Sequence, residues 1–526
     1  MLPKEFKERM TAILGDEAER LFDELENTEA VKAFRVNGIK CDAKALEDAG
    51  ATIDRDGSLW VENAYYTKEK YPGSLPEHHA GAIYMQDPSA MATVTALNDL
   101  DGSTVLDCCA APGGKTGQLC AAVGTNGVVF ANEYESSRAK ILYSNVERLG
   151  CANVIITNVD TSTYRDDYKR YFDVVVCDAP CSGEGMFRKN ERAIEEWSVE
   201  NVIMCAERQR EILSNVAPCV KAGGRLLYST CTFSLEENEM NVAWLLGNYP
   251  EFELCDVPCD LKSATSDGVN IEGCEYDMTK TRRCYPHVSK GEGQFIALFK
   301  RRSDGDDGAQ NGAEPVGVGG VNGVEDRERF SKKQRNKDKK ALEKGKKINN
   351  KYQNKQDVEL IELGKRFLEQ NLASVPDGEL LVLWDKLWLC PRAELLDRGL
   401  ISAGVCLGEA QKGRFVPHHQ LFSAFGNLFV RKLRLSYSGP RTSAYLFGEE
   451  LSLDGILRLG GDWQASFKEN VDARSRDEED AYFAPVGSEN GWAAVILGGC
   501  AAGAVKVSGG VAKNHYPKGL RNKRIG

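Results

Sequence analysis

The sequence predicts an α/β protein with a central, mostly parallel sheet, a small α/β region before it and an α+β region after it. Three observations support this fold class. Between residues 83 and 302, short apolar runs alternate with segments of helical periodicity, as in folds built from strand–helix–strand units. One run, residues 172–177, is continuous and β-branched, as expected for a strand buried on both faces. The alternation stops after residue 302, and globular composition resumes near residue 352.

The N-terminal region, residues 1–80, is predicted to be a small mixed accessory region. Residues 2–25 have helical periodicity and are rich in Glu and Lys, which predicts a helix. Residues 33–37 are typical of a strand that ends in a turn.

The central region, residues 81–302, is predicted to supply the main sheet. Its expected strands are short apolar runs, which lie at residues 104–106, 127–131, 153–157, 172–177, 225–229 and 294–300. Helices are expected at residues 136–149 and 207–220. The first stops at Gly150, and glycine is favoured directly after a helix end.

Residues 303–351 are predicted to be a disordered basic linker. Residues 303–324 have no apolar period, and residues 327–355 contain 13 Lys or Arg against 3 acidic residues. Such composition cannot bury enough apolar surface to order itself. Beyond it, residues 352–526 are expected to fold again, with a helix at 359–370, strands around Trp384 and Trp388, and Gly-punctuated strands at 491–505.

Composition excludes several classes of protein. The chain has 526 residues, of which 42% are hydrophobic and 28% charged, which is ordinary for a soluble globular protein and excludes a fully disordered chain. Its 17 cysteines are odd in number and show no repeated zinc spacing, so we expect thiols and no metal site. No signal peptide or apolar run of membrane length is visible, which predicts a cytoplasmic location. The net charge of the whole chain is −11, although the linker is locally basic. A basic segment in an acidic protein indicates an anionic partner.

A glycine-rich turn follows the strand at residues 104–106 and opens a helix. It comprises Asp107, Cys108, Cys109, Ala110, Ala111, Pro112, Gly113, Gly114, Lys115 and Thr116. Glycines let the backbone approach a ligand, and a helix N-terminus offers free N–H groups. Glu133 and Asp160 follow the next two strands. Each acid alone is more often a solvated strand end, but at successive strand ends they favour a bound nucleoside cofactor.

Two cysteines follow the fourth and fifth expected strands. Cys181 stands in Asp178-Ala179-Pro180-Cys181, and Cys231 in Ser229-Thr230-Cys231. If these strands are neighbours, the two thiols and Asp178 converge on one cleft. A single cysteine is usually a buried inert thiol, but two at adjacent strand ends favour catalysis. Chemistry alone allows either thiol to be the nucleophile.

These motifs resemble the RNA cytosine-5 methyltransferases of the Sun/Fmu family. The resemblance rests on CCAAPGGKT, DAPCSGEG and STCTFSLEENE, on the segment 85–91 (MQDPSAM) and on HVSKGEGQF at 287–295. It covers residues 30–302. Cys108 departs from the family, which often has Leu or Met there. The tail KNHYPKGLR at 513–521 is similar to one bacterial subgroup that methylates 16S ribosomal RNA and ends in a PUA-like RNA-binding fold.

The resemblance implies a Rossmann-like class I methyltransferase sheet and a role for each site residue. Cys231 would be the nucleophile that adds to cytosine C6, Cys181 would promote loss of the C5 proton and release, and Asp178 would contact the N3/N4 edge of the base. S-adenosyl-L-methionine would be the cofactor, held by Asp178 and by Cys109, Ala110, Ala111, Pro112, Gly113, Gly114, Lys115, Glu133 and Asp160. The partner would be ribosomal RNA or the small ribosomal subunit, bound by a monomer.

Other functions remain open. A DNA cytosine-5 methyltransferase would use Cys181 as its nucleophile, and an exocyclic-amine methyltransferase would carry an aromatic residue where Cys181 stands. A transfer RNA substrate is an alternative within the resembled family. A non-catalytic ribosome assembly factor is an alternative of another class, and it would tolerate the loss of Cys231.

Overall fold

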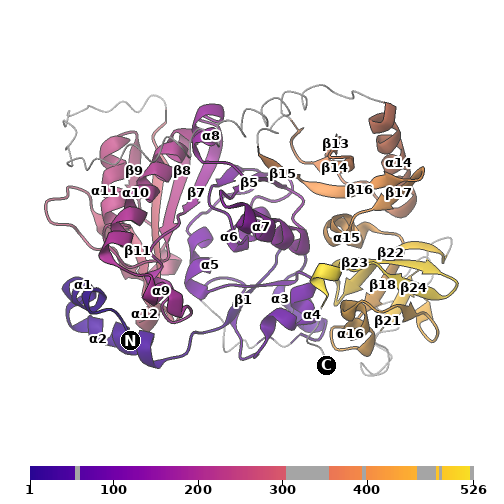
Figure 1. Cartoon of the computed structure of the whole chain (residues 1–526), viewed down its shortest axis with the longest axis horizontal. Coiled ribbons are helices and arrows are strands. Elements are labelled where there is room, and N and C mark those ends of the chain that lie inside the picture. Colours follow the sequence, from indigo (N-terminus) through magenta and orange to yellow (C-terminus); the bar gives the residue numbers. More distant parts are fainter. Residues whose placement is uncertain are drawn as a thin grey trace.

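The computed structural model describes residues 1–51, 53, 60–303, 355–393, 399–458, 481–484 and 489–521. Figure 1 shows the N-terminal helices at one end, a central sheet layered with helices, and the C-terminal sheets at the other end. Apart from Ser303, the predicted basic linker lies outside the described residues, as does the tail beyond residue 521.

The segment 1–95, which comprises the N-terminal region and the first part of the predicted central region, contains helices and a small antiparallel sheet with the strand order β2-β1-β3. Its elements are α1 (Lys4–Leu14), α2 (Ala18–Asn27), β1 (Ala33–Val36), α3 (Ala43–Asp48), β2 (Ala64–Tyr66), α4 (Pro76–His79), β3 (Ile83–Met85) and α5 (Pro88–Thr95). The expected strand at 33–37 is confirmed. The single helix expected over residues 2–25 is wrong, because Gly15 adopts φ +56° at the end of α1 and the chain turns before α2.

The central sheet runs β10-β11-β12-β8-β7-β4-β5-β6-β15, and β9 also pairs with β12. The strands are β4 (Thr104–Asp107), β5 (Val128–Asn132), β6 (Val154–Thr157), β7 (Phe172–Asp178), β8 (Val220–Thr230), β9 (Phe252–Cys255), β10 (Ser266–Asp267), β11 (Arg282–Cys284), β12 (Gln294–Arg301) and β15 (Leu400–Ala403). Strands β4 to β8 pair in parallel, whereas β12 and β15 pair antiparallel with β8 and β6. The predicted Rossmann-like sheet is therefore confirmed.

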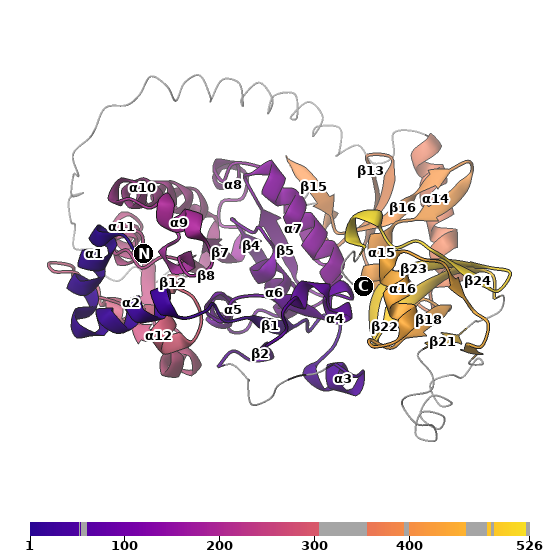
Figure 2. The same ribbon diagram turned by 60° about the horizontal axis from the view of Figure 1, so that its bottom comes forward.

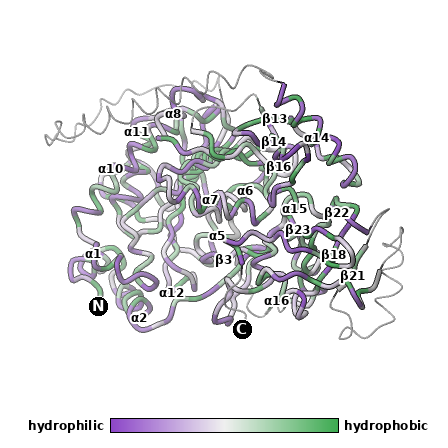
Figure 3. Tube along the Cα trace, turned by 45° about the vertical axis from the view of Figure 1, so that its right-hand side comes forward, coloured by the Kyte–Doolittle hydropathy of each residue, from purple (hydrophilic) through white to green (hydrophobic). Residues whose placement is uncertain are grey.

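Helices cover both faces of this sheet. They are α6 (Gly114–Ala122), α7 (Ser136–Leu149), α8 (Ser162–Asp167), α10 (Val199–Val216) and α11 (Glu239–Asn248). Two short helices, α9 (Glu191–Glu195) and α12 (Pro286–Ser289), lie near the N-terminal helices instead. Val105 packs with residues of α5, α6 and α7, whereas the next residue, Leu106, packs with residues of α8, α10 and α11. This alternation follows from the strand repeat of two residues. Figure 3 shows hydrophobic residues gathered in the interior strands.

The C-terminal region holds two further sheets, with strand orders β13-β14-β16-β17 and β19-β24-β23-β22-β18-β21-β20. The elements are α14 (Lys355–Asn371), β13 (Glu379–Leu383), β14 (Lys386–Cys390), β16 (Val405–Gln411), β17 (Arg414–Pro417), α15 (His419–Phe425), β18 (Lys432–Leu435), α16 (Pro440–Phe447), β19 (Leu451–Ser452), β20 (Leu457–Arg458), β21 (Ala481–Ala484), β22 (Gly491–Leu497), β23 (Cys500–Ser508) and β24 (Val511–Asn514). These confirm the expected helix at 359–370, the strands around Trp384 and Trp388, and the strands at 491–505. Within the described ranges, none of the helices is long and apolar enough to cross a membrane.

The C-terminal region contacts the central sheet directly. Strand β15 extends the sheet beyond β6, and Figure 2 shows it beside α7. The Ser423 hydroxyl of α15 donates to the carbonyl of Glu147 in α7 (2.7 Å). The Lys40 ammonium donates to the carbonyls of Ala80 (2.7 Å) and Ala501 (2.6 Å), so it joins the N-terminal region to β23.

Candidate active site

The candidate site residues follow the carboxyl ends of the parallel strands β4 to β8. The glycine-rich turn follows β4, Glu133 follows β5 and Asp160 follows β6. Asp178 ends β7, and Cys231 directly follows β8. Because these strands are parallel, their carboxyl ends lie at one edge of the sheet, where open α/β sheets bind ligands.

The turn at residues 109–115 brings backbone close to its neighbours. The Ala110 N–H donates to the carbonyl of Asn132 (2.8 Å), which fixes the turn against β5. Gly113 has φ +109°, and a Cβ on Gly114 would lie 2.8 Å from a ring carbon of Tyr84. Both positions therefore require glycine. The first turn of α6 presents its free N–H groups at this edge, which suits an anionic ligand group.

Two buried acids at this edge each carry an oxygen that accepts no hydrogen bond from the described residues. Glu133 is 4% exposed, and its Oε1 accepts from the N–H of Glu135 (2.9 Å). Its Oε2 has no hydrogen-bond partner among the described residues and lies 3.6 Å from Nη1 of Arg138. Asp107 accepts from the Thr116 hydroxyl at Oδ2 (2.7 Å), while its Oδ1 is unpartnered within the described part of the chain.

Burial raises the pKa of both acids, and that of Asp107 reaches about 7. A buried acceptor without a donor is costly, so these oxygens are suited to donors from a ligand. Ribose hydroxyls and an α-ammonium group are such donors. The residues present therefore fit a nucleoside cofactor with an amino-acid tail.

Asp160 lies on the next loop and is exposed. Its Oδ1 accepts from the N–H of Ser162 (2.9 Å), so the second oxygen is left for other donors. The Asn132 side chain donates to the carbonyl of Val159 (3.0 Å), which ties this loop to the strand that carries Glu133.

The thiols of Cys181 and Cys231 lie in contact, with 3.1 Å between their sulfur atoms. Strands β7 and β8 are adjacent and parallel, so the predicted convergence of the two cysteines is observed. The hydrogen bond with Cys231 and, next, burial raise the pKa of Cys181 well above its usual range. Cys181 is therefore held as a thiol that can donate to the sulfur of Cys231.

The Asp178 carboxylate is held by three donors. Lys115 Nζ lies 2.7 Å from Oδ2, and Oδ1 accepts from the Ser229 hydroxyl (2.7 Å) and from Gln294 Nε2 (3.2 Å). These contacts join the turn after β4, β7, β8 and β12. They fix the orientation of Asp178, which stands three residues before Cys181, and they place Lys115 on Asp178 rather than on a cysteine.

Glu184 ties the two cysteine loops together. It is fully buried and accepts from the Thr232 hydroxyl (2.8 Å) and the Phe233 N–H (2.8 Å) of the loop that carries Cys231. It also accepts from Trp197 Nε1 (2.9 Å). A buried carboxylate is stable only when it is fully hydrogen-bonded, so this loop geometry is strongly determined.

Glu237 is a second buried carboxylate at the cysteine loops. Its Oε2 accepts from the N–H of Ser182 (3.0 Å) and from Gln209 Nε2 (2.7 Å), while Oε1 is unpartnered among the residues described. Burial raises its pKa to about 7. Glu237 therefore holds the residue next to Cys181 from the far side of the loop.

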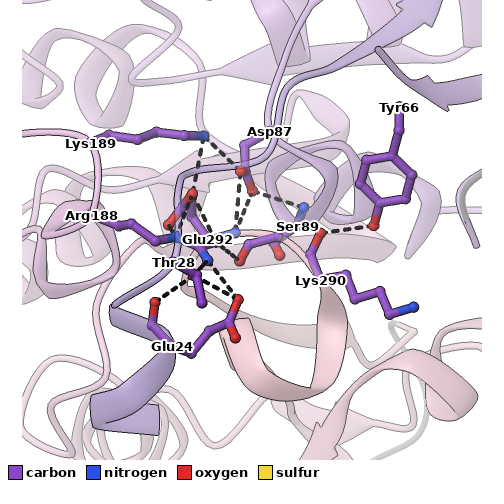
Figure 4. Close-up of polar contacts among 10 residues, drawn as sticks. Glu24, Thr28, Tyr66, Asp87, Ser89, Arg188, Lys189, Lys290 and Glu292 are labelled. Carbon is purple, nitrogen blue, oxygen red and sulfur yellow. Dashed lines mark hydrogen bonds and ion pairs between the residues drawn. The ribbon is translucent and has the colours of Figure 1, made fainter. Parts of the chain in front are cut away.

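A polar network joins four separate segments beside the site (Figure 4). Arg188 pairs with Glu24 of α2 (2.8 Å) and with Glu292 (3.1 Å), and Lys189 pairs with Asp87 (2.8 Å). The Glu292 N–H donates to Asp87 (3.1 Å). The segments 85–91 and 287–295, which carry the family resemblance, therefore meet in space.

No role was predicted from the sequence for Glu184, Glu237 or Gln294. The first two lie inside the quoted motifs DAPCSGEG and STCTFSLEENE. A glutamate in a polar loop normally points to solvent, so nothing local to the sequence predicts its burial. Gln294 stands at the start of an expected strand, and only the pairing of β12 with β8 brings it to Asp178.

Comparison with known proteins gives matches to three family models. Residues 94–300 match the 16S rRNA methyltransferase RsmB/F model, residues 2–88 match the N-terminal domain of 16S rRNA methyltransferase RsmF, and residues 478–522 match the methyltransferase RsmF PUA domain. These matches support the predicted C-terminal PUA-like fold.

Curated proteins similar to this chain have names that agree with these family models. Ribosomal RNA small subunit methyltransferase F of Enterobacter sp. (strain 638) is 38% identical over 46% of this chain and 49% of its own length. The protein of that name from Vibrio parahaemolyticus is 36% identical over 51% of this chain and 57% of its own length. The chain thus spans about half the length of the curated relatives it matches.

A solved methyltransferase homologue from Pyrococcus horikoshii superposes with a TM-score of 0.50 and 31% identity. The match covers 57% of this chain and 95% of that protein. This coverage, the family-model matches and the shared motifs agree with one another. The chain therefore belongs to the RsmB/F methyltransferases of the Sun/Fmu family, and its N-terminal and PUA segments match those of RsmF.

Proposed function

We propose that this chain transfers a methyl group from S-adenosyl-L-methionine to C5 of a cytosine in RNA, with 16S ribosomal RNA as the substrate. The contact between the Cys181 and Cys231 thiols carries the proposal. An N- or O-methyltransferase has no need of a pair of thiols, whereas C5 methylation requires a nucleophile that activates the ring. The names of the similar proteins support ribosomal RNA of the small subunit.

Cys231 is the proposed nucleophile. Its thiolate adds to C6 of the cytosine, a sulfur–C6 bond forms, and the electrons of the 5,6 double bond move so that C5 becomes nucleophilic. The thiolate is the reactive form of cysteine. The Cys181 thiol, 3.1 Å away, stabilises that thiolate by donating a hydrogen bond to it.

Asp178 is proposed to receive the N3/N4 edge of the base. Its donors Lys115, Ser229 and Gln294 hold the carboxylate at a fixed position before the base arrives. Such preorganisation stabilises the ring when N3 takes a proton from solvent water during addition, and that proton returns to solvent on elimination. The target base must leave its stacked position to reach this edge.

The cofactor is proposed to lie along the same strand ends. The turn at 109–115 would hold the amino-acid end, Glu133 the ribose hydroxyls and Asp160 the adenine, while Asp178 borders the methionine end. When bound, S-adenosylmethionine supplies the electrophilic methyl group that C5 takes up.

Cys181 is proposed to act in release. After methylation the C5 proton passes to a water molecule that acts as the base, its electrons re-form the 5,6 double bond, and the sulfur–C6 bond breaks to return the Cys231 thiolate. The raised pKa of Cys181 keeps its proton available to stabilise the departing sulfur. Removing Cys181 should therefore leave the addition intact and slow the release.

RNA is proposed to bind across several regions. We divide the chain into an N-terminal accessory region (1–80), a methyltransferase domain (81–302), a basic linker (303–351) and a C-terminal RNA-binding region (352–526). Lys and Arg in the linker and at residues 513–524 would contact phosphates, which adds affinity without sequence choice.

Methyl transfer to defined RNAs tests the proposal. The purified chain is incubated with methyl-labelled S-adenosylmethionine and with 16S ribosomal RNA, small subunits or transfer RNA, and the labelled nucleoside is identified by mass spectrometry. We expect 5-methylcytosine in 16S ribosomal RNA or in the small subunit. Labelled N4-methylcytosine would contradict the C5 chemistry, and labelling of transfer RNA alone would contradict the substrate.

A further inference from the structure

Strand β15 comes from the C-terminal region, yet it covers the edge of the methyltransferase sheet. It pairs antiparallel with β6, with Leu400 opposite Thr157 and Ala403 opposite Ile155. The Gly404 N–H donates to the carbonyl of Val154 (2.9 Å). An open edge strand would leave its backbone groups unpaired. The pairing with β15 supplies hydrogen-bond partners to β6 as far as the start of the Asp160 loop.

Gly399 makes the last of these contacts. Its carbonyl accepts from the N–H of Asn158 at 2.8 Å. Gly399 has φ +65°, and a Cβ there would lie 2.2 Å from Cγ1 of Val159 and 2.9 Å from the carbonyl oxygen of Asn158. No side chain fits at either distance, so the close approach to residues 158–159 depends on glycine.

Asn158 also binds the end of the strand that precedes Glu133. Its side-chain amide donates to the carbonyl of Glu133 (2.6 Å) and to that of Tyr134 (2.8 Å). The Glu133 N–H in turn donates to the carbonyl of Thr157 (3.1 Å). The backbone of Glu133 and the loop of Asp160 are therefore both anchored at one residue, whose own N–H is held by Gly399.

From this chain of contacts we infer that the C-terminal region completes the adenosine side of the cofactor site. Gly399 is a positioning residue. It holds Asn158, and through it the backbone of Glu133 and the start of the Asp160 loop. This inference rests on the proposed function, because it takes these two acids as the ribose and adenine contacts. It adds that cofactor affinity depends on a residue outside the methyltransferase domain.

Calorimetric titration of the full chain with S-adenosylhomocysteine tests the inference. The test variant is Gly399→Ala, and the matched control is Gly413→Ala between β16 and β17. Gly413 has φ +71°, but a Cβ there meets nothing within 4 Å. The control thus carries the same backbone strain without the contact with Val159.

We expect Gly399→Ala to weaken binding by about tenfold, as for the loss of one or two well-placed hydrogen bonds, with unchanged stoichiometry. In methyl transfer, the KM for S-adenosylmethionine should rise while kcat and the KM for RNA stay the same. Gly413→Ala should bind like the wild type. Adding Val159→Ala to Gly399→Ala removes the closest contact and should restore part of the affinity.

Binding of Gly399→Ala at wild-type affinity would overturn the inference, and so would equal weakening in Gly413→Ala. If Gly399→Ala instead lowers the stoichiometry, part of the variant is misfolded, and amide hydrogen exchange of the wild type then tests the inference. By linkage, S-adenosylhomocysteine should slow exchange in residues 399–404, and unchanged exchange there would overturn the inference. A wild type that does not bind S-adenosylhomocysteine would refute the proposed function itself.

Discussion

At the scale of single residues, two buried glutamates hold the loops that carry the two thiols of the candidate site. Cys181 and Cys231 lie 3.1 Å apart because Glu184 bonds to the loop after β8 and Glu237 bonds to the residue next to Cys181. Both acids are fully buried, so each must keep its hydrogen bonds for the fold to be stable. The geometry of the thiols is thereby fixed before RNA binds.

Glu133→Ala should weaken the binding of S-adenosylmethionine while leaving the fold intact. The Oε2 of Glu133 accepts no hydrogen bond from the described residues, although Arg138 lies 3.6 Å away, so it is suited to a ribose hydroxyl. Losing hydrogen bonds from a ligand to a charged group costs about 1.5–3 kcal/mol, or roughly tenfold or more in affinity. Calorimetry on the variant measures this, with Glu211→Ala on the exposed face of α10 as the control. An unchanged dissociation constant in Glu133→Ala would remove Glu133 from the cofactor site.

Glu237→Gln should change how stability depends on pH. Burial raises the pKa of Glu237 from 4.5 to about 7, so the stability from its neutral form is complete below pH 4.5 and is lost as the pH rises through 7. Glutamine stays neutral throughout. The stability of the variant relative to wild type should therefore rise by on the order of 2 kcal/mol from pH 5 to pH 8.

Urea unfolding of the two proteins at both pH values measures this difference. Glu211→Gln is the matched control, and its stability relative to wild type should not change between the two pH values. If the stability of Glu237→Gln relative to wild type is also the same at both pH values, the Glu237 carboxyl is already ionised at pH 5 in the folded protein.

The sequence was sufficient to predict Cys181, Cys231 and Asp178 near one another, because each follows a strand of a recognisable α/β pattern. The contact between Lys115 and Asp178 was not predictable, since it depends on how the turn after β4 faces β7. The burial of Glu184 depends on donors 13 to 50 residues away in the chain. Local patterns carry no information about such contacts.

At the scale of elements, strands were easier to predict than helix ends. Residues 172–178 form β7 as expected, because an unbroken β-branched run has few alternatives. Helix α10 was expected at 207–220 but runs over Val199–Val216. Its start was missed although the Ser198 side chain caps the N–H of Asn201, and it ends early because Pro218 cannot continue the helix.

The N-terminal helices pack against the loops of the site through an aromatic cluster. Phe6 of α1 is fully buried and lies 5.1 Å from the ring of Phe187 and 6.4 Å from that of Phe233. Phe187 follows Cys181, and Phe233 follows Cys231, each by a few residues. The accessory region therefore supports both cysteine loops.

Phe6→Ala should lower the free energy of unfolding by about 3–5 kcal/mol, because it empties a packed aromatic site. It should also reduce methyl transfer, since the cysteine loops lose support. Phe447→Ala, which removes a 49% exposed ring, is the control and should have little effect on either quantity. Urea unfolding and methyl transfer on the same samples check both points. Full activity in a strongly destabilised Phe6→Ala would show that the cluster stabilises the fold without positioning the loops.

At the scale of the whole molecule, the C-terminal region packs directly against the methyltransferase domain and adds a strand to its sheet. Strand β15 extends the central sheet, α15 packs on α7, and Lys40 bonds to the carbonyl of Ala501. Sequence patterns indicated the C-terminal helix and strands, but they did not indicate that this region pairs with the central sheet. The sequence of β15, LISA, is too short to specify a partner strand, which is set by the tertiary structure.

Limited trypsin digestion should cut first among Lys332, Lys337 and Lys347, where the composition predicts an unprotected basic linker. Because of β15 and α15, the two fragments should stay together. Size-exclusion chromatography of the nicked protein is expected to give one peak containing both. Separate elution would show that the pairing of β15 with β6 is weak, and first cleavage within residues 104–231 would show that the linker is misplaced.

Trapping of a covalent RNA adduct distinguishes the roles proposed for Cys231 and Cys181. Each alanine variant is incubated with 16S ribosomal RNA and S-adenosylmethionine and then run on a denaturing gel. Cys181→Ala should give a slowly migrating, protease-sensitive RNA band, because the sulfur–C6 bond forms but is not released. Cys231→Ala should give neither the band nor methylation. A trapped band with Cys231→Ala and none with Cys181→Ala would reverse the roles, and methylation by Cys231→Ala without any band would contradict the covalent mechanism.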